Sequence, residues 1–318
     1  MKLKALILSF SLPLLAQAQE PDCISIRTIF WNMQSGQADE PFLAAQMGEK
    51  GAVDIWGLSE VKNQSALDTF ERGIESATGL QYTAAVSDMG SSDRLAILYR
   101  ADRFDLVDDP AEDDDGFFEV EEVAVTSGLR PAFCAKLEGK TTGQQLVVAV
   151  NHFKCCGGDG NETKRVNQSR ALNAFARAQT LPVIAGGDYN FFIDPDDPDD
   201  PTDAFSVLVD DGPFVWVRPE VFVETEDTGS VLDHVFVANG IEGWDGETVI
   251  LRRGGNTPAP AGSLITDSAA ATDHRPVQAT FTVHCGDRAD ELIEEIQELK
   301  GLLAAKEAEL QRLLAHRN

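Results

Sequence analysis

Acids, amides and histidines recur in this sequence directly after short apolar runs, where β-strands would end. The six segments that show this are Phe30-Trp31-Asn32, Gly57-Leu58-Ser59-Glu60, Val150-Asn151-His152, Gly186-Gly187-Asp188-Tyr189-Asn190, Leu232-Asp233-His234 and Thr272-Asp273-His274. Ionisable groups beside apolar strands are costly unless they are paired or coordinated, so the series indicates one shared polar site. Each segment alone is more often a cap or a turn, because Asp and Asn favour such places. The ordered set is what predicts a site.

These residue types suit the hydrolysis of a phosphoester. A phosphodiester anion repels hydroxide, so hydrolysis needs a cation, a positioned and deprotonated water, and often a proton for the leaving oxygen. Hard oxygen ligands suit Mg²⁺, and imidazole exchanges protons near neutral pH. We therefore expect a Mg²⁺-dependent phosphoester hydrolase, with Mn²⁺ or Ca²⁺ as alternative ions.

Short β-rich runs that alternate with helical patterns must position these side chains. The expected strands cover residues 25–31, 53–58, 94–99, 132–137, 146–153, 182–187, 232–237 and 276–283, and the expected helices cover 64–77 and 162–178. This alternation predicts an α/β layered sandwich rather than an all-β domain. Periodicity alone does not distinguish it from another α/β arrangement.

The six segments, in this order, resemble the endonuclease/exonuclease/phosphatase superfamily. That superfamily includes pancreatic deoxyribonuclease, abasic-site endonucleases, secreted sphingomyelinases and inositol polyphosphate phosphatases. The resemblance runs from about Ile24 to Val283, and its most specific parts are the Gly-Asp-x-Asn and Asp-His-x-Pro pieces at residues 187–190 and 273–276. It implies a four-layered α/β sandwich with two packed, mainly antiparallel sheets.

The resemblance also implies roles at the metal and the phosphate. Glu60 would be the first metal ligand, assisted by Asn32, with Asp273 contributing across the site. Asp188 and Asn190 stand where the resembling enzymes hold the attacking water and bind the scissile phosphate. The intervening Tyr189 would point the other way on an extended segment.

Two histidines are expected to transfer protons. His274, fixed by Asp233 or Asp273, resembles the family histidine that contacts the phosphate. His152 is a second acid/base group that deoxyribonuclease-like and sphingomyelinase-like members share and abasic-site endonucleases lack. Asp93 falls where deoxyribonuclease has an acid that orients this histidine.

Two cations beside these segments are expected to contact phosphate. They are Arg130, in Leu-Arg-Pro-Ala, and Lys154, in the loop after His152. Ordinary surface ion pairing explains Asp93 and Arg130 as well, and a helix start with scattered surface charge explains the Lys154 loop. His234 should face away from Asp233 and be structural, while His284 and His316 are expected to take no part.

The formal charge of −27 opposes a surface that attracts nucleic acid as a whole. A polyanionic substrate would need a local basic path, for which the Lys154 loop is the candidate, or bound cations. Solubility or adaptation to salt explains the acidity otherwise.

The chain is expected to have three parts. Residues 1–18 have the basic, apolar and small-residue order of a signal peptide, which predicts a secreted or periplasmic protein without a membrane span. Residues 19–286 form the catalytic domain. Residues 287–318 have heptad-like leucines and predict a coiled-coil-like helix, which either forms a homo-oligomer or packs on its own domain.

Five cysteines make disulfides plausible in an exported chain. A bridge between Cys23 and Cys285 would tie the first strand to the last. Cys155 and Cys156 could fix their loop through disulfides, with Cys134 as a further partner. Zinc is the competing interpretation, although the sequence has no Cys-x-x-Cys pair.

The leading hypothesis is a secreted, metal-dependent endonuclease that hydrolyses DNA, and RNA as a second polymer. Its rival is a sphingomyelinase-like or small-molecule phosphodiesterase or phosphatase, for which Phe117-Phe118 and Phe191-Phe192 could supply exposed aromatics at a membrane. A third hypothesis is an inactive binding or scaffold protein. The retention of all six segments argues against it.

Overall fold

The computed structural model describes residues 24–108, 116–197, 202–239, 244–261 and 272–283, together with residues 300 and 306. The described strands and helices belong to one compact unit, Ser25–Val283. The predictions for the signal peptide, for Cys23 and Cys285, and for almost all of the helix at 287–318 lie outside the described residues. Within the described residues, no helix has the length and apolarity to cross a bilayer.

Two mixed sheets form the centre of the Ser25–Val283 unit. The first has the order β12-β13-β1-β2-β4-β3, with bounds Trp244–Ile250, Val277–Val283, Ile24–Asn32, Ile55–Val61, Arg94–Arg100 and Tyr82–Val86. The second has the order β10-β11-β9-β8-β7-β5, with β6 paired on β7, and bounds Val215–Trp216, Val231–Ala238, Val183–Ile193, Gln145–His152, Ala132–Gly139, Phe104–Leu106 and, for β6, Phe117–Val120.

Antiparallel pairing dominates both sheets, as expected. Strands β4, β7 and β11 run antiparallel to their neighbours, whereas β1 and β2, and β8 and β9, are parallel. The parallel pairs arise where a helix connects consecutive strands across a layer, since a crossover connection returns the chain in the same direction.

The inner faces of the two sheets pack closely through Phe30. A Cβ atom on Gly57 would lie 2.4 Å from the Phe30 ring, and one on Gly186 would lie 2.3 Å from it. Glycine at these positions therefore lets β2 and β9 approach the same aromatic ring. The neighbouring residues Ile29 and Trp31 point to the opposite face, because side chains alternate along a strand.

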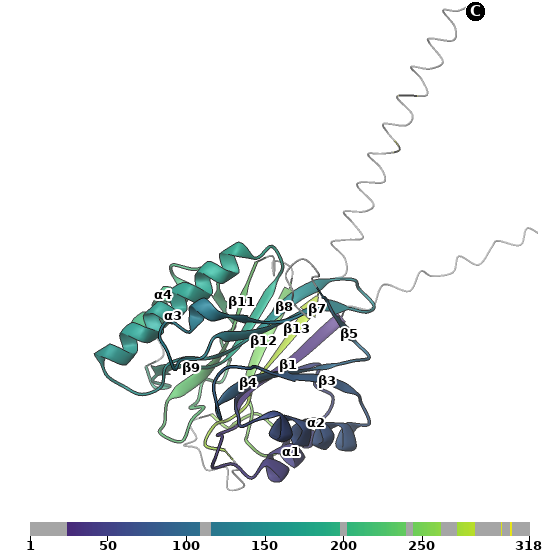
Figure 1. Ribbon diagram of the computed structural model, residues 1–318, viewed down its shortest axis with the longest axis horizontal. Coiled ribbons are helices and arrows are strands. Elements are labelled where there is room, and N and C mark those ends of the chain that lie inside the picture. Colours follow the sequence, from purple (N-terminus) through teal and green to yellow (C-terminus); the bar gives the residue numbers. More distant parts are fainter. Residues whose placement is uncertain are drawn as a thin grey trace, which may run out of the picture. The chain divides into compact units, whose positions relative to one another are not determined.

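Helices cover the two outer faces and complete the four layers (Figure 1). Helices α1, Glu40–Glu49, and α2, Gln64–Thr78, pack on the first sheet against an apolar cluster that includes Trp31 and Trp56. Helices α3, Asp159–Ala178, and α4, Asp203–Val209, pack on the second sheet against a cluster that includes Tyr189 and Phe191. The short 3-10 helix η1, Glu121–Val123, precedes β7. The predicted four-layered α/β sandwich is confirmed.

Candidate active site

The strand registers place the polar strand-end residues side by side. His152 is the register partner of Asp188 across β8 and β9, and Asp188 is the partner of Asp233 across β9 and β11. In the other sheet, Asn32 at the end of β1 pairs with Ser59, next to Glu60. Asn32 and His152 end their strands as expected, whereas Asp188 lies inside β9 and Asp233 lies near the start of β11. Residues from distant parts of the sequence therefore meet on adjacent strands.

A left-handed backbone conformation sets the direction of two of these side chains. Glu60 has a φ of 57° and Asn190 has a φ of 52°, a left-handed conformation that is unusual for residues other than glycine. Both lie near register shifts, in the β2–β4 and β9–β11 pairings. Such bulges bend a strand and redirect its side chains, and strained backbone of this kind gathers at functional sites.

Asp188 is the centre of the cluster. Its Oδ2 atom accepts a hydrogen bond from Asn32 Nδ2 at 3.0 Å. The same oxygen lies 3.5 Å from His152 Nε2 and 3.8 Å from His274 Nε2. Its other oxygen, Oδ1, accepts from the backbone N–H of Asn190 at 3.0 Å. One buried carboxylate thus lies between two imidazoles.

His274 is held by Asp233 in a fully buried pair. Its Nδ1 lies 2.8 Å from Asp233 Oδ2, compared with 3.9 Å between its Nε2 and Asp273 Oδ1. Burial by itself would lower the pKa of His274, but Asp233, Asp188 and Asp273 outweigh it and raise the pKa to about 10. Burial in turn raises the pKa of Asp233. The sequence left two partners open for His274, and the structure pairs it with Asp233.

His152 is held more loosely, by an acid that also binds an arginine. Its Nδ1 lies 3.5 Å from Asp93 Oδ1, while Asp93 Oδ2 accepts from Arg130 at 2.6 Å. Burial alone would raise the pKa of Asp93, but His152 and Arg130 outweigh it and lower the pKa. Arg130 therefore reaches the site through Asp93.

The donor set around Glu60 fits a divalent cation. Glu60, Asp93 and His152 each offer a ligand atom, and these atoms lie within 4.8 Å of one another. Glu60 Oε1 accepts from Asn32 Nδ2 at 3.0 Å. Asn32 Oδ1 in turn accepts from the backbone of Gln34, so Asn32 is engaged at both ends of its amide. Oxygen donors predominate, and they are the ligands that hard cations prefer.

Asp273 lies on the His274 side of the cluster. Burial, chiefly, raises its pKa, and the nearby carboxylates Glu226 and Asp227 add to the effect while His274 opposes it. Its backbone N–H donates to Gln34 Oε1 at 3.2 Å. A carboxyl group whose charge is disfavoured in this way gains from a nearby cation.

The two residues predicted for phosphate binding beside β8 and β9 have protein contacts of their own. Asn190 Nδ2 donates to the backbone carbonyl of Phe153 at 3.4 Å. Lys154 follows Phe153 directly, and its Nζ lies 3.2 Å from Cys155 Sγ. The Lys154 loop is thus adjacent to Asn190 through the backbone of Phe153.

His234 lies on the other face of β11, among aromatic rings. Its neighbours include Phe191, Phe205 and Trp216, and its Nε2 lies 3.3 Å from the carbonyl oxygen of Val231. Burial lowers its pKa to about 3, so it is neutral near pH 7. This environment agrees with the predicted structural role; His284 and His316 lie outside the described residues.

A profile of the endonuclease/exonuclease/phosphatase family matches residues 29–274, which include the strand-end residues from Asn32 to His274. The chain belongs to the endonuclease/exonuclease/phosphatase family. Members of this family are phosphoester hydrolases and typically depend on divalent metals. No curated protein sequence matches the chain significantly.

Solved structures of the endonuclease/exonuclease/phosphatase family share the fold. A family protein from Bacteroides thetaiotaomicron is 18% identical, with a TM-score of 0.59 over 83% of this chain and 99% of that one. A mannosyl-6-phosphatase from the same organism is 18% identical, with a TM-score of 0.55 over 80% and 99%. D. rerio TDP2 in complex with a single-strand DNA product is 15% identical, with a TM-score of 0.57 over 81% and 98%.

The sequence did not predict two residues that hydrogen-bond to the backbone of the site residues. Thr225 Oγ1 accepts from the backbone N–H groups of Leu232 and Asp233, which fixes the strand that carries the acid. Trp31 Nε1 donates to the carbonyl oxygen of His274 at 3.0 Å. Trp31 lay inside a recognised segment and could have been found, whereas Thr225 lies in a stretch without any pattern.

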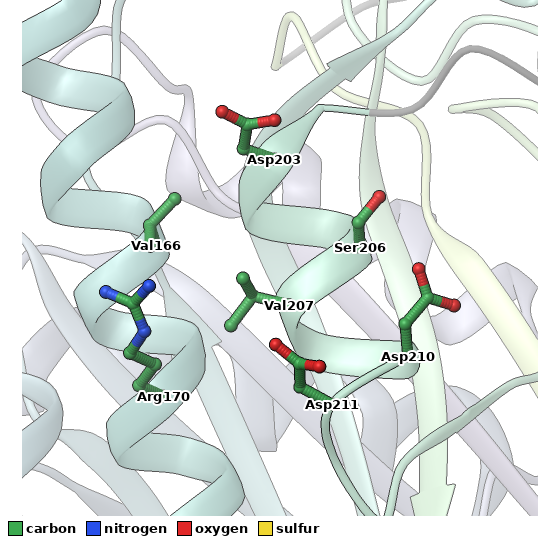
Figure 2. Close-up of a pocket in the computed structure, with 7 residues that line it drawn as sticks. All are labelled: Val166, Arg170, Asp203, Ser206, Val207, Asp210 and Asp211. Atoms are coloured by element: carbon green, nitrogen blue, oxygen red, sulfur yellow. The ribbon is translucent and has the colours of Figure 1, made fainter.

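Two cavities differ in their relation to the site. One of about 440 Å³ borders it and is lined by Gln34, Gln37, Asp39, Phe42, Asp227, Thr272 and Asp273. Another of about 300 Å³ lies between α3 and α4, and Figure 2 shows its lining, Val166, Arg170, Asp203, Ser206, Val207, Asp210 and Asp211. The second cavity contains none of the strand-end residues, so it is separate from the candidate site.

Proposed function

We propose that this chain is a Mg²⁺-dependent phosphodiesterase that hydrolyses DNA, and RNA as a second polymer. One observation supports the proposal above the others. The Asp188 carboxylate lies between two histidines, at 3.5 and 3.8 Å, and each histidine is held from behind by an acid of its own. This arrangement supplies one charged imidazole and one imidazole for proton transfer around a carboxylate that could bind the attacking water, which an inactive scaffold would not need.

The roles follow from the contacts of each side chain. Asp188 accepts a hydrogen bond from the backbone N–H of Asn190. In the proposed reaction Asp188 would orient the attacking water and Asn190 would bind a phosphate oxygen. His274, charged near pH 7, stabilises negative charge that develops on the phosphate. His152 can accept or donate a proton at Nε2 while Asp93 holds its Nδ1 side.

Glu60 is the residue we expect to hold Mg²⁺, with Asp273 as a second carboxylate and Asn32 as the amide that orients Glu60. The bound ion would neutralise charge on the phosphate and lower the pKa of a coordinated water. Asp93 is less suited as a ligand because Arg130 and His152 already balance its charge.

A nucleic-acid substrate is supported by two observations. D. rerio TDP2, which has the same fold, was solved with a single-strand DNA product. In this chain, Arg130 and the Lys154 loop adjoin His152 and Asn190, so cations lie beside the site of an otherwise acidic protein. They provide a local path for a polyanion that the net charge would repel.

A phosphatase acting on a small molecule is the second candidate. The cavity beside Asp273 is lined mainly by amides and carboxylates, together with Phe42 and Thr272, and these polar groups suit a hydroxyl-rich leaving group better than a second phosphate. The mannosyl-6-phosphatase of the same fold agrees with this candidate.

The sphingomyelinase-like candidate loses its support. Phe191 is fully buried, and Phe117 and Phe118 are half-buried and pack on other rings. Phe192 is half-buried under the guanidinium of Arg165. These aromatics therefore do not form the exposed membrane-facing hairpin that this activity would call for.

The test is a side-by-side assay of the full chain with Mg²⁺ on plasmid DNA, a mannosyl 6-phosphate and sphingomyelin vesicles. We expect DNA cleavage that EDTA abolishes and added Mg²⁺ restores, and that His274→Ala removes. Asp105→Asn, which changes an exposed acid on β5 paired with Lys140, is the control and should retain activity. Cleavage of the sugar phosphate alone would favour the second candidate, and no turnover with Mg²⁺, Mn²⁺ or Ca²⁺ would refute the catalytic proposal.

We also propose that residues 1–18 direct export and are removed. Their basic, apolar and small-residue order supports this. Intact-mass measurement of protein recovered outside the cytoplasm should show a chain that begins after residue 18, and an intact N-terminus would contradict export by this route.

A further inference from the structure

Two adjacent cysteines follow the catalytic strand β8, and their sulfur atoms are in contact. Cys155 Sγ lies 2.8 Å from Cys156 Sγ. In an extended chain, successive side chains point to opposite faces, which would separate the two sulfurs. The backbone of this loop must therefore be folded to bring both thiols to one side.

A buried arginine imposes that fold. Arg165, on α3, donates from Nη1 to the carbonyl oxygens of both Lys154 and Cys156 at 2.9 Å. Its side chain is 3% exposed and is held by Glu162 at 2.6 Å. Because one guanidinium binds the carbonyls on both sides of Cys155, the chain turns sharply between them.

The turn places Cys156 in an unusual conformation. Its φ is 72°, in the left-handed region that residues with a Cβ atom rarely adopt. Such strain persists only where surrounding contacts determine it, and here it accompanies the contact between the two sulfurs. The contact is thus part of a constrained loop rather than a chance approach of two exposed side chains.

We propose that Cys155 and Cys156 form a redox-active pair that closes to a vicinal disulfide beside the active site. Both sulfurs can be reached, since Cys155 is half-buried and Cys156 is exposed. Cys134, in contrast, is fully buried in the apolar core. In the structure Cys155 and Cys156 are free thiols, which is the reduced state of this pair.

The oxidant is a small disulfide of the glutathione class. The thiolate of Cys155 attacks one sulfur of glutathione disulfide, forming a mixed disulfide and releasing one glutathione thiolate. The thiolate of Cys156 then attacks Cys155 Sγ, forming the ring and releasing the second glutathione. The protein loses two hydrogens, and the glutathione disulfide is reduced to two glutathione molecules.

Closure of the ring would also change Lys154. Its ammonium group donates to Cys155 Sγ at 3.2 Å in the reduced state. A disulfide sulfur carries no negative charge and is a weak acceptor, so oxidation releases this ammonium group. Lys154 directly follows Phe153, whose carbonyl oxygen accepts a hydrogen bond from Asn190. This second step rests on the proposed function, because it assumes that a substrate phosphate binds there.

Peptide mapping tests the pair without reference to activity. The full chain is incubated with glutathione disulfide, alkylated and digested with trypsin, which cuts after Lys154 and Lys164 and leaves both cysteines on residues 155–164. We expect this peptide to be lighter by two hydrogens and unalkylated, also in Cys134→Ser. Cys156→Ser should instead retain one glutathione on Cys155. A peptide that stays fully alkylated, or one linked to the peptide that carries Cys134, would overturn the proposal.

Kinetics on the same samples test the consequence for Lys154. Oxidation should raise kcat/KM for a phosphodiester by about threefold to tenfold, the size of one partly exposed charge contact. Lys154→Gln and Cys155→Ser/Cys156→Ser should not respond. If the disulfide forms without a change in kcat/KM, the proposed role of Lys154 is refuted and the proposed redox pair still stands. An enzyme inactive on every phosphoester would count against the proposed function, while the peptide map still decides the disulfide.

Discussion

The two histidines of the site are held by acids in different surroundings. Asp233 is fully buried, and its oxygen lies 2.8 Å from His274. Asp93 is 31% exposed, lies 3.5 Å from His152, and also binds Arg130 at 2.6 Å. Asp233 therefore interacts chiefly with His274, whereas Asp93 interacts with both His152 and Arg130.

This difference assigns the two histidines to different tasks. The carboxylates around His274 raise its pKa to about 10, so this imidazole is a fixed positive charge near pH 7. An imidazole that is always charged can stabilise an anion but cannot serve as a base. In the proposed reaction, the proton-accepting step would therefore fall to His152, whose neighbouring acid Asp93 is partly neutralised by Arg130.

Of the variants that compare the two histidines, Asp233→Asn should have the largest effect on kcat. Removing this carboxylate takes away the main cause of the charge on His274, so we expect kcat to fall by about 10²–10⁴-fold. Steady-state kinetics on a generic phosphodiester, with KM followed separately, would measure it. Thermal unfolding of the variant shows whether the fold is retained, and Asp105→Asn is the matched control on an exposed strand.

Asp93→Asn should have a smaller effect, about tenfold in kcat, because Asp93 orients His152 and does not itself hold the cation. Its Mg²⁺ affinity, measured by calorimetry, should remain close to that of the parent, whereas Glu60→Gln should lose most of its affinity. Equal losses of kcat in the Asp93 and Asp233 variants would contradict the division of roles. A loss of Mg²⁺ binding in Asp93→Asn would place Asp93 among the ligands instead.

His234 sharpens the comparison, because it is as buried as His274 but faces aromatic rings instead of carboxylates. Burial lowers its pKa from 6.5 to about 3. At pH values between about 3 and 6.5, His234 binds a proton in the unfolded chain but not in the folded one. The free energy of unfolding therefore falls as pH decreases from 6.5 toward 3. Between about pH 7.5 and pH 5, this residue should cost about 2 kcal/mol of stability.

The measurement is urea denaturation of the parent and of His234→Phe at both pH values. The variant keeps a ring among Phe191, Phe205 and Trp216 and should lack this part of the pH dependence. The same pH dependence in both proteins would show that His234 titrates as an ordinary surface histidine. The kcat of the variant should be close to that of the parent, since His234 lies outside the catalytic cluster.

The sequence predicted the strands of the candidate site well because each one contains an apolar run beside a polar residue, although β9 continues past Asp188 to Ile193 instead of ending there. The strands that carry Asn32, His152, Asp188 and Asp233 were all expected, as were α2 and α3. Helices α1 and α4 and the strands β3, β5, β6, β10 and β12 were not. Most of these are short or lie near a sheet edge, where packing against the rest of the fold outweighs the local pattern.

Partners within the site were harder to predict, because they depend on register between distant strands. Asp273 precedes His274 directly, and the sequence could not choose between it and Asp233. Asp233 lies in β11, 41 positions away in the sequence, yet it contacts Nδ1. Lys154 was expected at a phosphate because of its place in the basic loop after His152. The turn that brings Cys155 Sγ to within 3.2 Å of its ammonium group had no signature in the sequence.

The hydrogen bonds that join the first strand to the last segment of the domain have a consequence for synthesis. Trp31 Nε1 binds the carbonyl oxygen of His274, and Thr272 Oγ1 binds that of Asn32, across 243 and 240 positions of sequence. Closing so long a loop is slow, and it can happen only after nearly all of the domain has been made. A nascent chain, or one truncated before residue 272, would carry most of the site residues and still have no hydrolytic activity.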